Sequence, residues 1–223
     1  MKNRIQPAEV AAPSAAVAGL EAWARCHWLA LANAAVAVFA GLPILAPAML
    51  AAGWSQPALL IYSVYRTTCH QWPGRSYFLF GPQLAYSMDD LERYGLGTAH
   101  DFMGNAALGF KVAYCERNFA IYTTLLVAGL VYALLRGRIG PLPWQGLAAL
   151  LLPIALDGLT QLTGARESDW LLRTLTGVLA GVAGAWLVYP RVDRAFGITA
   201  PATAGRPVER LEGECPTAAR PLT

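Results

Sequence analysis

The sequence predicts an all-α membrane protein with about four transmembrane helices and one or two short interfacial or re-entrant helices in a long outer loop. Of its 223 residues, 56% are hydrophobic and only 14% are charged, whereas a typical soluble domain has about 25% charged residues. The charged residues gather at the N-terminus, between residues 66 and 117, and in the C-terminal tail. The apolar runs between them approach the roughly 20 residues that a helix needs to cross a bilayer.

The first apolar run covers about residues 28–52 and contains no charged residue. Trp28 and Trp54 bracket it, as aromatic residues do at the two membrane interfaces. Pro43 and Pro47 each remove a helical hydrogen bond. We therefore expect a span that is bent in its second half.

A long polar loop follows the first span. Ser55 and Pro57 combine a capping hydroxyl with a proline near the first turn, which predicts the start of a short interfacial or re-entrant helix. Residues 77–80 read YFLF and precede Gly81-Pro82, a pattern that predicts a short extended piece and a turn. We expect a further short helix over about residues 99–108.

Three more apolar runs cover about residues 112–135, 143–162 and 170–189. Pro143 suits a helix start, and Pro153 predicts a kink in the middle of its span. Three glycines leave a smooth face for close helix packing on the last span: Gly177, Gly181 and Gly184.

These spans predict a flexible N-terminus at 1–24, a transmembrane domain at 25–189 and a disordered tail at 190–223. Four spans place both termini on the same side. Short basic flanks fall on that side, and the positive-inside rule favours a cytoplasmic position for it in the cell membrane: Lys2, Arg4, Arg25, Arg136, Arg138, Arg191 and Arg194. The bias is modest, because the opposite side also has basic residues: Arg66, Arg75, Arg93, Lys111 and Arg166.

Several classes of function have little support in the sequence. The net charge is only +3 and no basic cluster is interleaved with aromatic residues, so nucleic-acid binding is not indicated. No nucleotide-binding loop, HExxH or GxSxG occurs, which leaves the hydrolase and kinase mechanisms with such motifs unsupported. The four cysteines form no CxxC pair: Cys26, Cys69, Cys115 and Cys215.

The predicted topology brings the long loop, the start of the second span, the end of the third and the start of the fourth to the outer face. We therefore expect a polar cluster there: Cys69, His70, Arg75, Cys115, Arg117, Asp157, Gln161 and Arg173. Asp157 and Gln161 are four residues apart and share a helix face. Because a carboxylate within a span is costly, Asp157 should have a partner. Arg173 and Arg117 are the expected partners, in a working site or only as a tie between spans.

The cysteines of this cluster have three open interpretations. Cys69 and Cys115 can form a disulfide in an oxidising outer compartment. They can join His70 and Asp157 as metal ligands, because thiolate, imidazole and carboxylate all bind zinc. They can also be ordinary packing residues, since cysteine behaves as a small hydrophobe.

Arg75 follows Trp72-Pro73-Gly74, so a turn presents its side chain. A guanidinium pairs well with phosphate or carboxylate, which makes an anionic headgroup or substrate one interpretation. The simpler interpretation is a salt bridge to loop acids such as Asp89, Asp90 or Glu92.

At these residues the sequence resembles DUF2085, a family of predicted prokaryotic membrane proteins of unknown function. The resemblance covers about residues 60–185 and rests on four blocks: Cys69-His70-Gln71-x-Pro73-x-Arg75-Ser76-Tyr77, Cys115-x-Arg117 with Ile121-Tyr122, Asp157-Gly158-x-x-Gln161, and Arg173-x-x-Thr176-Gly177. It implies a membrane location and a shared polar site. Many members carry a second cysteine where this chain has Asn118, so a CxxC redox pair or a three-cysteine metal site is absent here.

Three classes of function remain open for this multi-pass protein. The favoured one is an accessory or binding protein, or a subunit of a membrane complex, in the lipid bilayer. The second is an outer-face membrane enzyme, redox or metal-dependent, acting on a lipid or quinone-like substrate. The third is a small transporter that uses Asp157 and Arg173, although no inverted repeat is visible.

Overall fold

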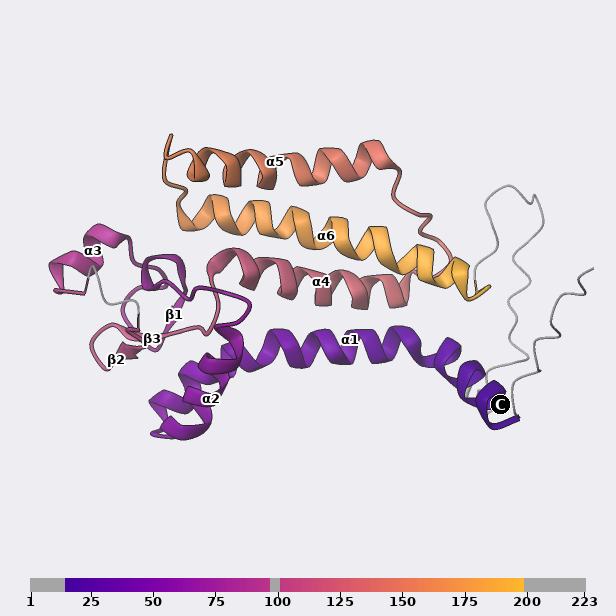
Figure 1. Ribbon diagram of the computed structural model, residues 1–223, viewed down its shortest axis with the longest axis horizontal. Helices are drawn as coiled ribbons and strands as arrows, with labels where there is room; N and C mark the ends of the chain where they lie inside the picture. The colour runs from indigo at the N-terminus through magenta and orange to yellow at the C-terminus, as the bar shows by residue number, and fades with distance from the viewer. Residues whose placement is uncertain (1–14, 97–100, 199–223) are drawn as a thin grey trace, which may run out of the picture.

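The computed structural model describes residues 15–96 and 101–198. Four of its helices are long and apolar enough to cross a membrane: α1 (Ala15–Ala51), α4 (Glu116–Leu134), α5 (Trp144–Leu162) and α6 (Trp170–Ala195). They lie side by side in the order α1, α4, α6, α5 (Figure 1). The predicted all-α membrane fold with four candidate spans is confirmed.

The first and the last helix along the chain are longer than predicted. The first begins at Ala15 rather than near Trp28, because the alanine-rich segment before the span also favours a helix. The last continues through Pro190 to Ala195, where Asp193 is fully buried by contacts described below. The predicted flexible segment 1–24 and tail 190–223 are therefore partly helical, and their remaining residues lie largely outside the described ranges.

The segment between α1 and α4 contains three short helical elements: α2 (Ser55–Tyr65), the 3-10 turn η1 (Pro73–Arg75) and α3 (Met88–Arg93). The predicted helix start at Ser55 is correct, although no side chain caps it. The helix predicted over 99–108 is wrong. The helix forms earlier, where Ser87 and Asp90 make a capping box.

A small antiparallel sheet replaces the predicted second loop helix. Its strands are β1 (Phe78–Leu79), β2 (Gly104–Asn105) and β3 (Gly109–Lys111), in the order β1-β3-β2. Phe78 pairs with Lys111, which confirms the extended piece predicted at YFLF. Gly109 has a φ of 83°, a conformation that glycine adopts without strain and a helix does not use.

Two prolines let α1 hold this segment in place. Proline has no N–H, so Pro43 and Pro47 leave the carbonyls four residues earlier without a helical donor. Those carbonyls belong to Phe39, which accepts the Tyr65 hydroxyl at 2.7 Å, and to Pro43, which accepts the Ala113 N–H at 3.1 Å. The helix runs through both prolines without a break, and its freed carbonyls anchor the loop at the end of the bundle.

The α4–α6 contact is close because α6 presents glycine. A Cβ on Gly181 would lie 2.6 Å from the Ile121 carbonyl oxygen, and one on Gly177 would lie 2.8 Å from the Arg117 carbonyl oxygen. The packing role predicted for this glycine stripe is therefore confirmed at these two positions. At Gly184 a Cβ would make only an ordinary contact with Leu125.

The opposite end of the bundle is tied by one buried carboxylate. Asp193 of α6 is 0% exposed and accepts hydrogen bonds from three side chains, which lie on α1, on α4 and just after α4: Trp28 at 2.9 Å, Tyr132 at 2.7 Å, and Arg136 at 2.9 and 2.5 Å. These bonds satisfy a charge that burial would otherwise make costly. They also explain why α6 extends past the predicted end of its span.

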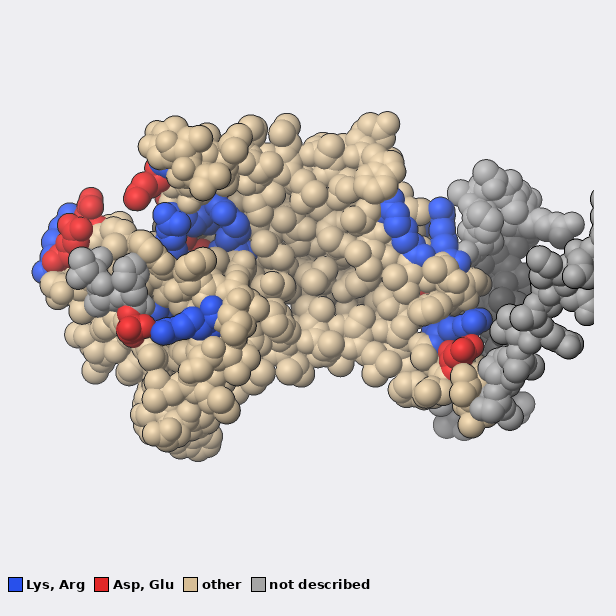
Figure 2. Space-filling view, viewed as in Figure 1, with Lys and Arg blue, Asp and Glu red and all other residues tan. Residues whose placement is uncertain are grey.

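The charged side chains on the face seen in Figure 2 gather at the two ends of the molecule, with a broad uncharged band between them. Among the residues of α5, all of which are described, only Asp157 is buried. The remaining surface of this helix is mostly apolar, as expected for a helix that faces lipid.

Candidate functional site

The predicted outer-face residues meet where the loop 66–115 joins the ends of α4, α5 and α6. Six of the eight fall into two groups with different partners, whereas His70 and Arg75 belong to neither group. We call the first the thiol site; it consists of Cys69, Gln71, Lys111 and Cys115. We call the second the ion-pair network; it consists of Glu116, Arg117, Asp157, Gln161, Arg166 and Arg173.

The sulfur of Cys69 lies in a cradle of hydrogen-bond donors. It accepts the backbone N–H of Cys115 at 3.2 Å, and it also accepts the Cys115 thiol and the backbone N–H of Gln71. Cys115 is the N-cap residue of α4, so this sulfur lies at the end of the helix where the macrodipole favours negative charge. Cys69 is 9% exposed and belongs to an apolar cluster with Tyr62, Tyr65 and Tyr114.

Gln71 sets the geometry of this cradle. Its φ is 54°, which is uncommon for a residue other than glycine and is typical of functional segments held by their surroundings. Its buried side chain donates to the carbonyls of Tyr62 and Ala113, each at 2.8 Å. The Lys111 ammonium donates to the carbonyl of Gln71 at 2.5 Å. The strained turn is therefore fixed from both sides.

The hydrogen bonds and charges around Cys69 favour its thiolate form. Its pKa is lowered to about 6, chiefly by the hydrogen bond from the Cys115 thiol, against burial, and further by backbone N–H groups and the charge of His70. The pKa of Cys115 is raised, because its thiol donates to Cys69 and is itself buried. Burial lowers the pKa of Lys111 to about 8, although the nearby Cys69 acts in the opposite direction. Cys69 is thus the acidic member of the pair.

Three interpretations of the cysteines were left open by the sequence, and in this structure the pair carries no disulfide and the possible metal ligands lie apart. Cys69 and Cys115 are adjacent but both are free thiols. His70 is exposed, and Asp157 belongs to the ion-pair network instead. Across residues 15–96 and 101–198, no three His, Cys, Asp or Glu side chains come together as metal ligands would. The four proposed metal ligands therefore do not share one centre.

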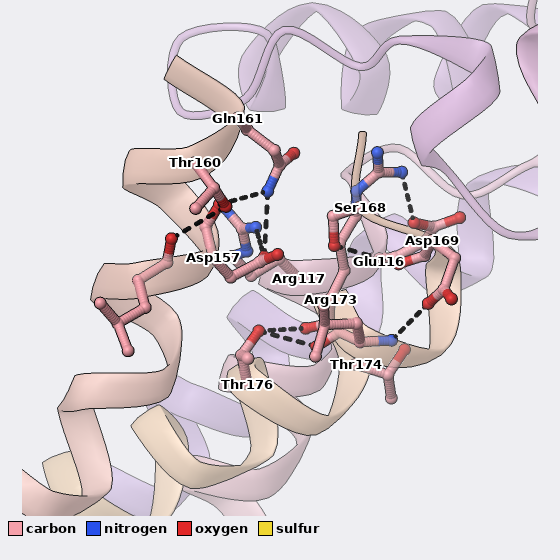
Figure 3. A network of polar contacts seen from close by, with 12 residues as sticks. Glu116, Arg117, Asp157, Thr160, Gln161, Ser168, Asp169, Arg173, Thr174 and Thr176 are labelled. Atoms are coloured by element: carbon pink, nitrogen blue, oxygen red, sulfur yellow. Dashed lines mark hydrogen bonds and ion pairs between the residues drawn. The ribbon is translucent and has the colours of Figure 1, made fainter. Parts of the chain in front are cut away.

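The ion-pair network joins the ends of three helices (Figure 3). The Asp157 carboxylate, 1% exposed, accepts Arg117 of α4 and Arg166 of the α5–α6 connection, the latter at 2.9 Å. Gln161, one turn along α5, donates to the same carboxylate at 3.0 Å. Arg117 is the partner predicted from the sequence.

Arg173 is not the partner that the sequence predicted for Asp157. It pairs at 3.1 Å with Glu116, and the two side chains are 8% and 1% exposed. Both of them line a polar cavity of about 380 Å³ that also contains Arg75. Arg75 lies over the Trp72 ring, 5.7 Å from its centroid. Asp90 pairs with Arg93 instead, so the salt bridge suggested between Arg75 and Asp90 is not formed.

Sequence reasoning missed several residues of these groups: Gln71, Lys111, Glu116 and Arg166. A signal existed for Glu116, because an acid in the first turn of an apolar span needs a partner. None distinguished Lys111 from other loop lysines, since its burial depends on the pairing of β1 and β3.

Comparison with known proteins gives two matches. The model of the DUF2085 family, described as a predicted membrane protein, matches residues 106–187. The uncharacterized protein MJ1492 of Methanocaldococcus jannaschii is 33% identical over 140 residues, which are 61% of this chain and 71% of that protein. No solved structure is significantly similar to the chain. The chain thus belongs to the DUF2085 family of predicted membrane proteins.

Proposed function

We propose that this protein is a thiol–disulfide redox protein of the membrane, with Cys69 as its nucleophile and Cys115 as the resolving thiol. The observation that carries the proposal is the cradle around the Cys69 sulfur, which accepts two backbone N–H groups and the Cys115 thiol. Charged acceptors make the strongest hydrogen bonds of this kind. A packing cysteine needs no such donors, whereas a thiolate does.

The reaction is an exchange with a partner molecule that carries a disulfide. The Cys69 thiolate attacks one partner sulfur, so that a mixed disulfide forms and the partner S–S bond breaks. The first leaving thiolate takes a proton from water. Cys115 then gives its proton to the second leaving thiolate as its sulfur attacks the Cys69 sulfur. Two electrons pass from the cysteine pair to the partner, and the reverse reaction oxidises a partner dithiol.

We place the site at the outer face of the membrane. The ends of α4 and α6 that lie away from the thiol site have four arginines in or beside them: Arg136, Arg138, Arg191 and Arg194. Short basic flanks of this kind favour the cytoplasmic side. An outer compartment also supplies disulfide partners, because it is more oxidising than the cytosol.

Trapping of the mixed disulfide tests the proposal. The purified protein is treated with a small disulfide such as cystamine, and the adducts are mapped by mass spectrometry. We expect Cys115→Ser to accumulate an adduct on Cys69, because the resolving thiol is gone. Cys69→Ser should accumulate far less on Cys115, whose pKa is raised. Ser63→Ala, at an exposed position of α2, is the control and should behave as the wild type.

Two results would contradict the proposal. In one, Cys115→Ser gives no adduct on Cys69 although the variant is folded. In the other, both variants react equally, which would mean that the cradle does not distinguish the two thiols. Either result would favour the accessory or subunit role predicted from the sequence.

A further inference from the structure

The polar cavity beside the thiol site contains a cation and an anion that form no ion pair with any described residue. It lies between η1, α3 and the first turns of α4 and α6, and it shares no residue with the thiol site. These are the ends of two candidate spans, so the cavity is at the depth of the membrane interface. The lining includes Arg75, Arg173, Glu116 and Glu167.

Arg75 is the unused cation. Among the described residues, no carboxylate lies within salt-bridge distance of its guanidinium, whereas Arg173 beside it is paired with Glu116. The Trp72 ring holds Arg75 by a cation–π contact, which orients the side chain without satisfying its five donors. The buried Arg173 also has an Nε for which no partner is found in the described parts of the chain.

Glu167 is the unused anion. The other three carboxylates of the cavity already have partners. Asp90 belongs to the capping box of α3, and Glu116 pairs with Arg173. Asp169 caps α6, where it accepts the Leu172 N–H at 2.7 Å. Glu167 is exposed, and no ion pair or hydrogen bond of its side chain is found among the described residues.

We propose that this cavity binds the headgroup of a phospholipid that carries a phosphate and a primary ammonium, as in phosphatidylethanolamine. The phosphate would bind Arg75 and the donors of Arg173, because a guanidinium matches phosphate geometry. The ammonium would bind Glu167. Trp170, which lines the cavity and is 46% exposed, would lie among the headgroups as interfacial tryptophans do.

Lipid retention in nanodiscs of equal phosphatidylethanolamine and phosphatidylglycerol tests this site. The protein is extracted from the nanodiscs, and the bound lipid is counted by native mass spectrometry. We expect the wild type to retain phosphatidylethanolamine preferentially. Arg75→Gln should lower retention of both lipids about tenfold, since one charge-assisted contact is lost. Glu167→Gln should remove the preference, because phosphatidylglycerol has no ammonium. Arg138→Gln, at the opposite end of the bundle, is the control.

Equal retention of the two lipids by the wild type would overturn the proposal, as would an effect of Arg138→Gln equal to that of Arg75→Gln. Soluble phosphoethanolamine serves as the second arm. If it binds in an Arg75-dependent way while no lipid is retained, the lipid source is wrong and a soluble zwitterion is the ligand.

Discussion

Cys69 receives its donors from separate parts of the chain, and each part is held by its own contacts. The Gln71 N–H depends on a left-handed turn, whose carbonyl accepts the Lys111 ammonium of β3. The Cys115 N–H belongs to the N-cap of α4. A thiolate is the reactive form of cysteine, and its population at neutral pH is set by such neighbours. The reactivity of Cys69 should therefore depend on residues that never touch its substrate.

The pH dependence of alkylation reports this effect. Because the pKa of Cys69 is lowered to about 6, its reaction with iodoacetamide should rise to half of its maximum near that pH and stay level above it. Lys111→Met removes a neighbouring positive charge and should move the midpoint upward, toward the ordinary value of 9.0. Rates at Cys69 are read by mass spectrometry. A wild-type midpoint near the ordinary value would refute the thiolate assignment.

Buried and exposed members of the ion-pair network should differ in their contribution to stability. Glu116→Gln leaves the buried Arg173 without its carboxylate and should lower the free energy of unfolding by roughly 3–5 kcal/mol. Arg166 is 48% exposed, so Arg166→Gln should cost only about 0–1 kcal/mol. Unfolding in mixed micelles with increasing SDS measures both. Equal losses would mean that burial does not govern these pairs.

The spacing of residues along the chain predicted some of the side-chain contacts of the ion-pair network. The pattern Asp157-x-x-x-Gln161 placed both side chains on one helix face, and they do interact. The partner of Arg173 could not be predicted, because the rotation of each helix about its own axis is not contained in the spacing. Gln71 and Lys111 lie outside the regular helices, where only tertiary contacts determine burial.

The helices and strands show which local signals decide structure in this chain. The long apolar runs identified all four spans, because length and composition suffice for a bilayer. The helix expected over 99–108 failed because Gly104 and Gly109 adopt positive φ and join a sheet. The capping box at Ser87 and Asp90 is the stronger helix signal in this segment.

Glycine at the α4–α6 contact gives a prediction with a control in the same bundle. Gly181→Ala would place a Cβ 2.6 Å from the Ile121 carbonyl oxygen, so the helices must separate and the protein should be destabilised. At Gly158 of α5 a Cβ meets nothing within 4 Å. Gly158→Ala should be neutral or stabilising by up to about 1 kcal/mol. SDS unfolding compares the two variants, and a stable Gly181→Ala protein would contradict the packing described.

The whole molecule is a bundle whose two ends have different compositions. One end carries the α2–α3 segment, the small sheet and the thiol site. The other carries exposed arginines and the buried Asp193 with its hydrogen-bond donors (Figures 1 and 2). The positions of the charged residues along the sequence predicted that they gather at the two ends of the bundle, since charged residues avoid the hydrocarbon region.

The orientation of the bundle can be measured with single cysteines in a cysteine-free background. Leu84→Cys lies in the exposed loop near the thiol site, and Gly137→Cys lies in the exposed connection between α4 and α5. We expect a membrane-impermeant maleimide to label Leu84→Cys in intact cells and Gly137→Cys only after permeabilisation. The reverse pattern would place the thiol site in the cytoplasm.

A redox titration of the native protein shows whether Cys69 and Cys115 form a reversible redox pair. The protein is equilibrated in buffers of increasing oxidising potential, and the link between Cys69 and Cys115 is quantified by peptide mapping. We expect that this disulfide forms and is reduced reversibly, with two electrons, while the protein stays folded. A pair that remains unlinked across the whole range, or that links only after unfolding, would show that the thiol site is not a redox centre.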